Sequence, residues 1–136
     1  MITDYSKPLP EITEDNQPFW DGCREHKLLL QRCSRCGHLR DANPLCPECW
    51  APDHDWVEAS GRGSVYSWIV VHQRYSKAFE DDLPYNVAIV ELEEGPRLLT
   101  TLMEIDNGDI RPGMQVEVVF EDVTEEVTLP KFRPRP

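Results

Sequence analysis

Four cysteines, arranged as two Cys-x-x-Cys pairs, are the residues whose types and spacing point most clearly to chemistry. Cys33 and Cys36 form the first pair, which Gly37 follows at once, and Cys46 and Cys49 form the second, with nine residues between the pairs. A Cys-x-x-Cys turn brings two thiolates to one side of a tight loop, and glycine supplies a backbone conformation that other residues resist. Two such turns offer the tetrahedral four-sulfur set that zinc prefers. We therefore expect one structural zinc ion per chain, with no open position for catalysis.

Two other chemistries remain open for the same four cysteines, which could instead form two disulfides or bind iron as in rubredoxin. His38 and His54 flank the cysteines and are spare candidate ligands, but four sulfurs already fill a tetrahedral site. The fifth cysteine, Cys23, falls in a predicted helix, where a small apolar residue more often packs than reacts. Cysteines assigned to a metal are more typical of a reducing cytoplasm than of a secreted disulfide framework.

No other group of residues is typical of catalysis. The four histidines lie in different segments, and none belongs to a recognisable nucleophile–base motif. Gly61-Arg62-Gly63 is too short for a phosphate-binding loop and precedes a predicted strand rather than a helix. We assign no catalytic residue and expect the chain not to be an enzyme by itself. The alternative that this chain completes an active site together with a partner chain remains open.

The formal charge of −11 is unevenly distributed along the chain. Residues 24–40 carry +4 and the tail Lys131–Arg135 carries +3, so the remaining residues carry −18. A zinc ion held by four thiolates has a net charge of about −2, which would reduce the excess around the cysteines to about +2. The basic segments could meet phosphate or an acidic partner, or they could simply be solvated. The acidic remainder would repel nucleic acid.

The segments on either side of the cysteines must position them. Residues 1–14 are polar and proline-rich, which predicts an extended arm. Asn16 can cap a helix that runs to about residue 26, and within it Phe19 and Trp20 would pack on the chain's own core or on another subunit. Strands are predicted over 28–32, leading into the first cysteine pair, and over 55–59, leaving the second.

A β pattern begins after a predicted turn and domain boundary at 60–63. Residues 64–73 predict a long first strand with Val65, Ile69 and Val71 on one face. A polar loop follows at 75–83 and a hairpin at 85–103. Residues 105–114 suit a turn or one helical turn, and two more strands are predicted at 115–121 and 123–129. Five short strands with one interruption after the third suggest an OB-type barrel. The predicted organisation is an arm over 1–14, a helix and rubredoxin-like zinc ribbon over 15–60, a barrel over 61–130 and a basic tail over 131–136.

This order of elements resembles the zinc-ribbon/OB-fold family known as domain of unknown function 35. The resemblance extends from about residue 8 to the end of the chain, and its motifs are Phe19-Trp20, Leu28–Cys33, Cys46–Cys49, Ser60–Ser67, Glu94–Arg97, Pro112-Gly113 and Leu129–Pro134. Family members often have an aromatic-Pro-Pro stretch before the second cysteine pair. This chain has Arg40–Pro44 there, which leaves open any ligand contact that the usual stretch would make.

The resemblance implies a non-catalytic companion of a thiolase-superfamily enzyme. Such enzymes include acyl-CoA thiolases, hydroxymethylglutaryl-CoA synthase assemblies and the lipid-transfer-protein-like aldolases of steroid side-chain breakdown. The chain would dock on its partner, stabilise it and help to hold the pantetheine arm of an acyl-CoA. The residues that we expect to contact the partner or substrate are Phe19, Trp20, Arg40, Tyr75, Lys77 and Phe79.

The alternative function is binding of single-stranded nucleic acid, since zinc ribbons and OB barrels both serve that role. Such a barrel needs aromatic side chains interleaved with Lys and Arg, but residues 64–130 hold only four basic residues among many acids. The sequence also has no apolar run of membrane-spanning length, and its N-terminus lacks the layout of a signal peptide. We therefore expect a cytoplasmic protein without a membrane partner.

Overall fold

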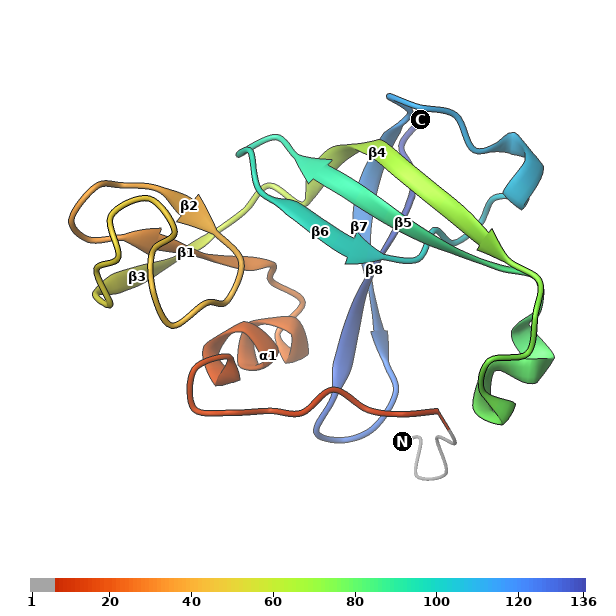
Figure 1. Cartoon of the computed structure of the whole chain (residues 1–136), viewed down its shortest axis with the longest axis horizontal. Coiled ribbons are helices and arrows are strands. Elements are labelled where there is room, and N and C mark those ends of the chain that lie inside the picture. The colour runs from red at the N-terminus through yellow and green to blue at the C-terminus, as the bar shows by residue number, and fades with distance from the viewer. Residues whose placement is uncertain (1–6) are drawn as a thin grey trace.

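The computed structural model describes residues 7–136, so residues 1–6 of the predicted arm lie outside the described part. Residues 7–136 form one α-helix, two short 3₁₀ helices and eight strands, arranged as a small ribbon beside a larger curled sheet (Figure 1). Within residues 7–136, no helix is long and apolar enough to cross a membrane. The elements are α1 (Gln17–Arg24), β1 (Leu29–Cys33), β2 (Leu39–Arg40), β3 (His54–Glu58), β4 (Arg62–Val71), η1 (Lys77–Asp82), β5 (Tyr85–Leu92), β6 (Arg97–Thr100), η2 (Asn107–Asp109), β7 (Gln115–Asp122) and β8 (Thr128–Pro134).

Helix α1 leads the chain into the ribbon. Asn16 occupies the N-cap position, but its side chain does not cap the helix as predicted. The Asn16 Oδ1 instead accepts a hydrogen bond from the Thr13 backbone N–H at 2.7 Å, which fixes the turn before the helix. Gly22 allows the helix to lie close to β1, because a Cβ there would come within 2.7 Å of Leu29 Cγ. The helix therefore packs directly on the strand that carries the first cysteine.

The ribbon is a three-stranded antiparallel sheet in the order β2-β1-β3. All five residues of β1 pair with β3, from Leu29 opposite Glu58 to Cys33 opposite His54. The short β2 pairs with the other edge of β1, where Arg40 lies opposite Gln31. Figure 1 shows this ribbon to one side of the larger sheet, with α1 below.

The larger sheet has five antiparallel strands in the order β6-β5-β4-β7-β8. It curls so that its two outer strands meet at a parallel bridge between Leu102, just after β6, and Phe132 of β8. The Phe132 backbone N–H donates to the Thr101 carbonyl at 3.3 Å, and the Met103 N–H donates to the Phe132 carbonyl at 2.7 Å. The predicted fold class, with one N-terminal helix, a four-cysteine ribbon and a five-stranded OB-type sheet, is confirmed.

The prediction of which β4 side chains face the core is wrong beyond Val65, the fourth residue of the strand. A β-bulge lies between Val65 and Ser67 in the pairing of β4 with β5. A bulge adds one residue to one strand and reverses the alternation of side chains beyond it. Val65 is buried, but Ile69 points outward and Trp68 packs against the core instead. A strand without the bulge would have kept Val65 and Ile69 on one face.

The last strand begins later than predicted. Residues 123–127 form a turn, closed by hydrogen bonds from the Val123 and Thr124 N–H groups to the Val127 carbonyl, both at 3.1 Å. Strand β8 then takes in most of the predicted basic tail. It contains Pro130 and Pro134, which cannot donate ladder hydrogen bonds. This is tolerated because β8 lies at the end of the strand order.

The segment predicted as a polar loop over 75–83 contains the 3₁₀ helix η1. Ser76 precedes this helix, and its hydroxyl oxygen accepts a hydrogen bond from the Ala78 N–H at 3.3 Å. Serine at this position supplies an acceptor for one of the N–H groups that a helix start leaves unpaired. The cap and short helix therefore give a defined backbone to a segment that composition alone describes as a loop.

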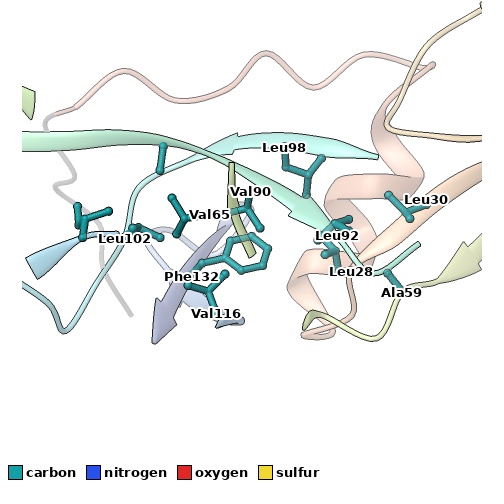
Figure 2. Packing of buried hydrophobic residues seen from close by; sticks show 12 residues of the cluster. Leu28, Leu30, Ala59, Val65, Val90, Leu92, Leu98, Leu102, Val116 and Phe132 are labelled. Atoms are coloured by element: carbon teal, nitrogen blue, oxygen red, sulfur yellow. The ribbon is translucent and has the colours of Figure 1, made fainter. Parts of the chain in front are cut away.

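The ribbon and the curled sheet share one hydrophobic core. Leu28 and Leu30, which lead into and along β1, pack in the same cluster as Leu92 and Leu98 of the curled sheet, as Figure 2 shows. Phe132 is fully buried and is the largest side chain of the core. Its ring lies among β-branched residues from three strands of the sheet, Val65, Val90 and Val116 (Figure 2). The two parts are therefore packed against each other, although each has its own sheet.

Candidate metal centre and contact surfaces

The four cysteines of the ribbon come together at one point. Their sulfur atoms all lie within 4.8 Å of one another, with Cys33 Sγ 3.5 Å from Cys49 Sγ and Cys36 Sγ 3.6 Å from Cys46 Sγ. These distances are too long for disulfide bonds. Zinc–sulfur bonds of about 2.3 Å in a tetrahedron would place the sulfurs roughly 3.8 Å apart. The donor set therefore fits a tetrahedral thiolate-bound metal ion.

The two cysteine pairs have matching backbone conformations. The Gly37 N–H donates to the Cys33 carbonyl at 2.9 Å, and the Trp50 N–H donates to the Cys46 carbonyl at 2.8 Å. The first cysteine of each pair also donates its N–H to a carbonyl five residues later, that of His38 or Ala51. Gly37 and Trp50 both adopt positive φ, of 79° and 64°. Each pair thus forms one knuckle, and we use this term for residues 33–38 and 46–51.

Backbone donors also prepare the first knuckle for a thiolate. The Cys36 and Arg35 N–H groups each lie 3.4 Å from Cys33 Sγ. The pKa of Cys33 is lowered to about 6. The largest cause is the hydrogen bond from the Cys36 N–H, and the hydrogen bond from the Arg35 N–H lowers the pKa further. Within the described residues, the spare candidates His38 and His54 are not part of the sulfur cluster. The ring of His54 instead hydrogen-bonds through Nδ1 to the Pro52 carbonyl at 2.9 Å.

Cys23 lies apart from this cluster, in the buried face of α1. Burial raises the pKa of its thiol to about 12. A thiol with such a pKa is almost entirely protonated near neutral pH, and the thiol is a poor nucleophile. The packing role expected for this residue agrees with its complete burial.

Phe19 and Trp20 line a groove between α1 and the curled sheet. Their rings contact each other edge to face, with centroids 5.1 Å apart, and both side chains are half-buried. The groove has a volume of about 430 Å³, and Leu98, Leu99 and Pro130 form part of its opposite wall. Both aromatic residues thus line an apolar groove, and Phe19 also packs against the core.

Arg40 is buried, with only 5% of its surface exposed. It lies opposite Gln31 on the neighbouring strand, and its Nη2 donates to the Asn43 carbonyl at 3.4 Å. The Asn43 N–H in turn donates to Gln31 Oε1 at 3.1 Å. Arg40 therefore links β2 to the chain between the knuckles, in the stretch where this sequence departs from the family pattern. The Arg40 side chain is thus mostly enclosed by its own chain, and its contact with a partner or substrate stays a prediction.

The other three predicted contact residues lie at η1: Tyr75 just precedes this helix, and Lys77 and Phe79 belong to it. Tyr75 is 78% exposed, and Lys77 is also exposed. Phe79 is half-buried, and its ring lies 5.7 Å from that of Tyr85. The segment that holds these three residues lies at the far end of the curled sheet from the ribbon (Figure 1), and their contact with a partner or substrate stays a prediction.

Two features were not predicted from the sequence. His26 Nε2 lies 3.1 Å from Asp122 Oδ1, which also accepts a hydrogen bond from Thr128 Oγ1 at 2.6 Å, so the end of α1 is tied to the β7–β8 hairpin. Local sequence patterns cannot predict this contact, because His26 and Asp122 are 96 positions apart in the chain. The second feature is an apolar face of the curled sheet, turned away from the core, which includes Ile69 of β4, Val87 and Ile89 of β5, and Leu99 of β6. Its signals in the sequence are the unbroken apolar runs at 68–71 and 87–90.

Comparison with known proteins places this geometry among similar chains. A family model described as "ChsH2, rubredoxin-like zinc ribbon domain" matches residues 20–55, and one described as "ChsH2, C-terminal OB-fold domain" matches residues 56–121. A chain of the solved "Ltp2-ChsH2(DUF35) aldolase" is similar with a TM-score of 0.83 and 44% identity, over 93% of this chain and 98% of that one.

Two curated relatives represent different lengths of protein. A "DUF35 domain-containing scaffold protein" of Methanocaldococcus jannaschii is 36% identical over 110 residues, which cover 79% of this chain and 77% of that protein. A "Probable enoyl-CoA hydratase alpha subunit" of Thermomonospora curvata is 44% identical over 129 residues, which cover 94% of this chain. This chain spans only 40% of the length of that second relative.

Proposed function

This chain belongs to the DUF35 family of zinc-ribbon/OB-fold proteins, and on that premise we propose that it is a non-catalytic accessory subunit of a thiolase-superfamily enzyme. It docks on an enzyme subunit of the Ltp2 type, stabilises it and helps to position an acyl-CoA substrate. The observation that carries this proposal is the similarity to a chain of the Ltp2–ChsH2(DUF35) aldolase over nearly the whole length of that chain.

In this proposal the metal is one structural zinc ion, held by Cys33, Cys36, Cys46 and Cys49. The close approach of the four sulfurs and the two matching knuckles support it. Four thiolates leave no position for a substrate or a water molecule, so the ion would fix the knuckles and supply no catalytic chemistry. Cysteines that bind a metal are more typical of a reducing compartment than of a secreted disulfide framework, and we place the protein in the cytoplasm.

In this proposal the partner enzyme, and not this chain, carries the catalytic residues, which agrees with the surroundings of Cys23 and His26. Cys23 is buried with a raised pKa, and His26 is held by Asp122 on the surface of the hairpin. These two residues offer no activated nucleophile, which requires a lowered pKa or an adjacent base. The partner enzyme then supplies the nucleophile and base, and this chain supplies position.

The groove beside α1 is the part of the chain that we assign to the acyl-CoA. Its walls combine Phe19 and Trp20 with the apolar residues of β6 and β8, and such walls suit the methylene groups of a pantetheine arm. Holding that arm matters for rate, because a misplacement of about 1 Å can cost roughly 100-fold. Trp20→Ala should therefore lower the activity of the complex even at temperatures where the isolated variant is still folded.

Reconstitution with the Ltp2 subunit of the Ltp2–ChsH2(DUF35) aldolase tests the function. The chain alone should show no aldolase activity, and Ltp2 should be more active or more soluble when the chain is present. Cys23→Ser, which changes a residue that we place outside the machinery, should leave the activity of the complex nearly unchanged. Loss of turnover in that variant, with complex and zinc intact, would mean that Cys23 is a catalytic residue.

A further inference from the structure

The curled sheet is apolar on both faces over three of its strands. Side chains of β5 alternate regularly: the even-numbered residues from Asn86 to Leu92 are buried, and the odd-numbered residues from Tyr85 to Glu91 point outward. An antiparallel sheet with one solvated face normally carries polar residues there. In β5, however, the outward positions 87 and 89 are Val and Ile.

The strands on either side of β5 continue this apolar surface. Ile69 of β4 pairs with Val87, and Leu99 of β6 pairs with Ile89, so all four side chains share one face. The bulge in β4 adds Tyr66 to the same side. Ile69 is 62% exposed and Leu99 74% exposed. We call this surface the outer face, and its apolar residues are Tyr66, Ile69, Val71, Val87, Ile89 and Leu99.

The charged residues at the margin of the outer face are already paired. Arg97 Nε lies 3.1 Å from Glu91 Oε2, and the Arg97 guanidinium lies 3.8 Å above the ring of Tyr66. Arg97, at the margin of the face, thus pairs with a carboxylate and covers an aromatic ring, and the Val and Ile side chains beside it carry no charge. Contiguous apolar surface of this kind on a small protein usually marks a contact with another molecule.

The charge of the surrounding barrel decides what kind of molecule fits. Residues 61–130 contain five basic and fourteen acidic side chains, a net charge of −9. A second copy of this chain would bring another −9 against it, and nucleic acid or an anionic membrane would be repelled in the same way. A protein with an apolar patch and a basic margin is complementary in both respects.

We propose that the outer face of β4, β5 and β6 is the surface on which the Ltp2-type enzyme subunit docks, through an apolar patch surrounded by basic residues. This inference rests on the proposed function and adds the surface to it. The outer face is continuous with the groove beside α1, because Leu99 lines both. A docked partner would thus cover the sheet and reach the groove from one side.

The test compares outward substitutions with matched controls, using the full chain and purified Ltp2. Ile69→Glu and Leu99→Glu place a carboxylate at the centre of the proposed contact, where burial without a partner is costly. Ile12→Glu and Leu45→Glu make the same two substitutions at exposed apolar positions in the arm and the ribbon. Thermal melting and zinc content should match the wild type in all four variants, because all four side chains are exposed.

We expect each outer-face variant to raise the Kd for Ltp2 at least tenfold, and each control to change it less than threefold. We also expect the wild-type association rate to fall as salt is raised, since opposite charges attract the two proteins. If wild-type chain forms no complex, the proposed function itself fails. If it binds Ltp2 and the outer-face variants bind equally well, or only the controls lose binding, the function stands and the docking surface is wrong.

Discussion

At the scale of single residues, Trp50 and Gly37 illustrate how similar backbone demands are met differently in the two knuckles. Both have positive φ, but glycine adopts this conformation freely, whereas other L-residues pay roughly 1–2 kcal/mol. The Trp50 side chain is 72% exposed, so little packing offsets that cost. The Cys-x-x-Cys spacing predicts both turns, yet only Gly37 signals the positive φ in the sequence.

A pair of substitutions at position 50 tests this interpretation. Trp50→Gly should retain zinc and change the free energy of unfolding by less than about 1 kcal/mol, because glycine suits the conformation. Trp50→Val should destabilise the ribbon by roughly 1–2 kcal/mol, since a β-branched residue is an outlier at positive φ. Denaturant unfolding of the zinc-loaded proteins measures both. Equal effects of the two substitutions would show that the indole matters through its contacts.

Asp122 should make the link between α1 and the hairpin sensitive to acid. The hydrogen bond from Thr128, and then the contact with His26, lower the pKa of the Asp122 carboxyl below its ordinary value. A carboxyl whose pKa is lower in the folded state than in the unfolded state stabilises the fold at pH values above its unfolded-state pKa of about 3.9. This stabilisation is lost as the pH falls through the folded-state pKa. Asp122→Asn should therefore destabilise the protein near pH 7, and its difference from the wild type should shrink below about pH 4. A difference that is the same at both pH values would contradict the assigned cause.

At the scale of elements, the cysteine spacing and the β pattern predict the ribbon, the helix and the five strands, but not how each strand is placed. The face of β4 depends on a bulge after Val65, and a bulge leaves no reliable mark in a single sequence. The extent of β8 was missed because Pro130 and Pro134 argue against a strand unless it is known to lie at an edge. Sequence patterns report local preference, whereas these features depend on the neighbouring strand.

Strand β8 closes the sheet through Phe132, and this closure should carry much of the stability. Phe132→Ala removes the largest fully buried side chain and should destabilise the fold by about 3–5 kcal/mol. Leu99→Ala removes an exposed apolar side chain and should cost less than about 0.5 kcal/mol in the isolated chain. Urea unfolding of the two variants checks this. Similar costs would mean that the closing strand is not packed as described.

At the scale of the whole molecule, the shared core couples the ribbon to the barrel, while a metal ion bound to the four cysteines would hold only the knuckles. Leu28 and Leu30 pack with the barrel, whereas Cys33 and Cys46 form a separate small cluster with Ala51. Metal binding by small zinc domains is worth about 10–16 kcal/mol, so removing zinc should unfold the knuckles. Strands of the barrel should persist, because their core does not include the metal ligands.

A strong chelator tests this separation, with hydrogen exchange read segment by segment. Amide protection should fall over residues 33–51 and remain over β4, β5 and β7. Cys46→Ser should produce the same pattern without chelator, and Cys23→Ser should retain one zinc ion per chain. Loss of protection throughout the barrel would show that the metal supports the whole fold.

The measurement that tests the central claim most directly is the mass of the species formed when this chain is mixed with Ltp2, determined by sedimentation velocity near physiological salt. We predict a single complex that contains both proteins, with little of either left over at matched concentrations. Two species that sediment as the separate proteins would contradict the claim that this chain is an accessory subunit of an Ltp2-type enzyme.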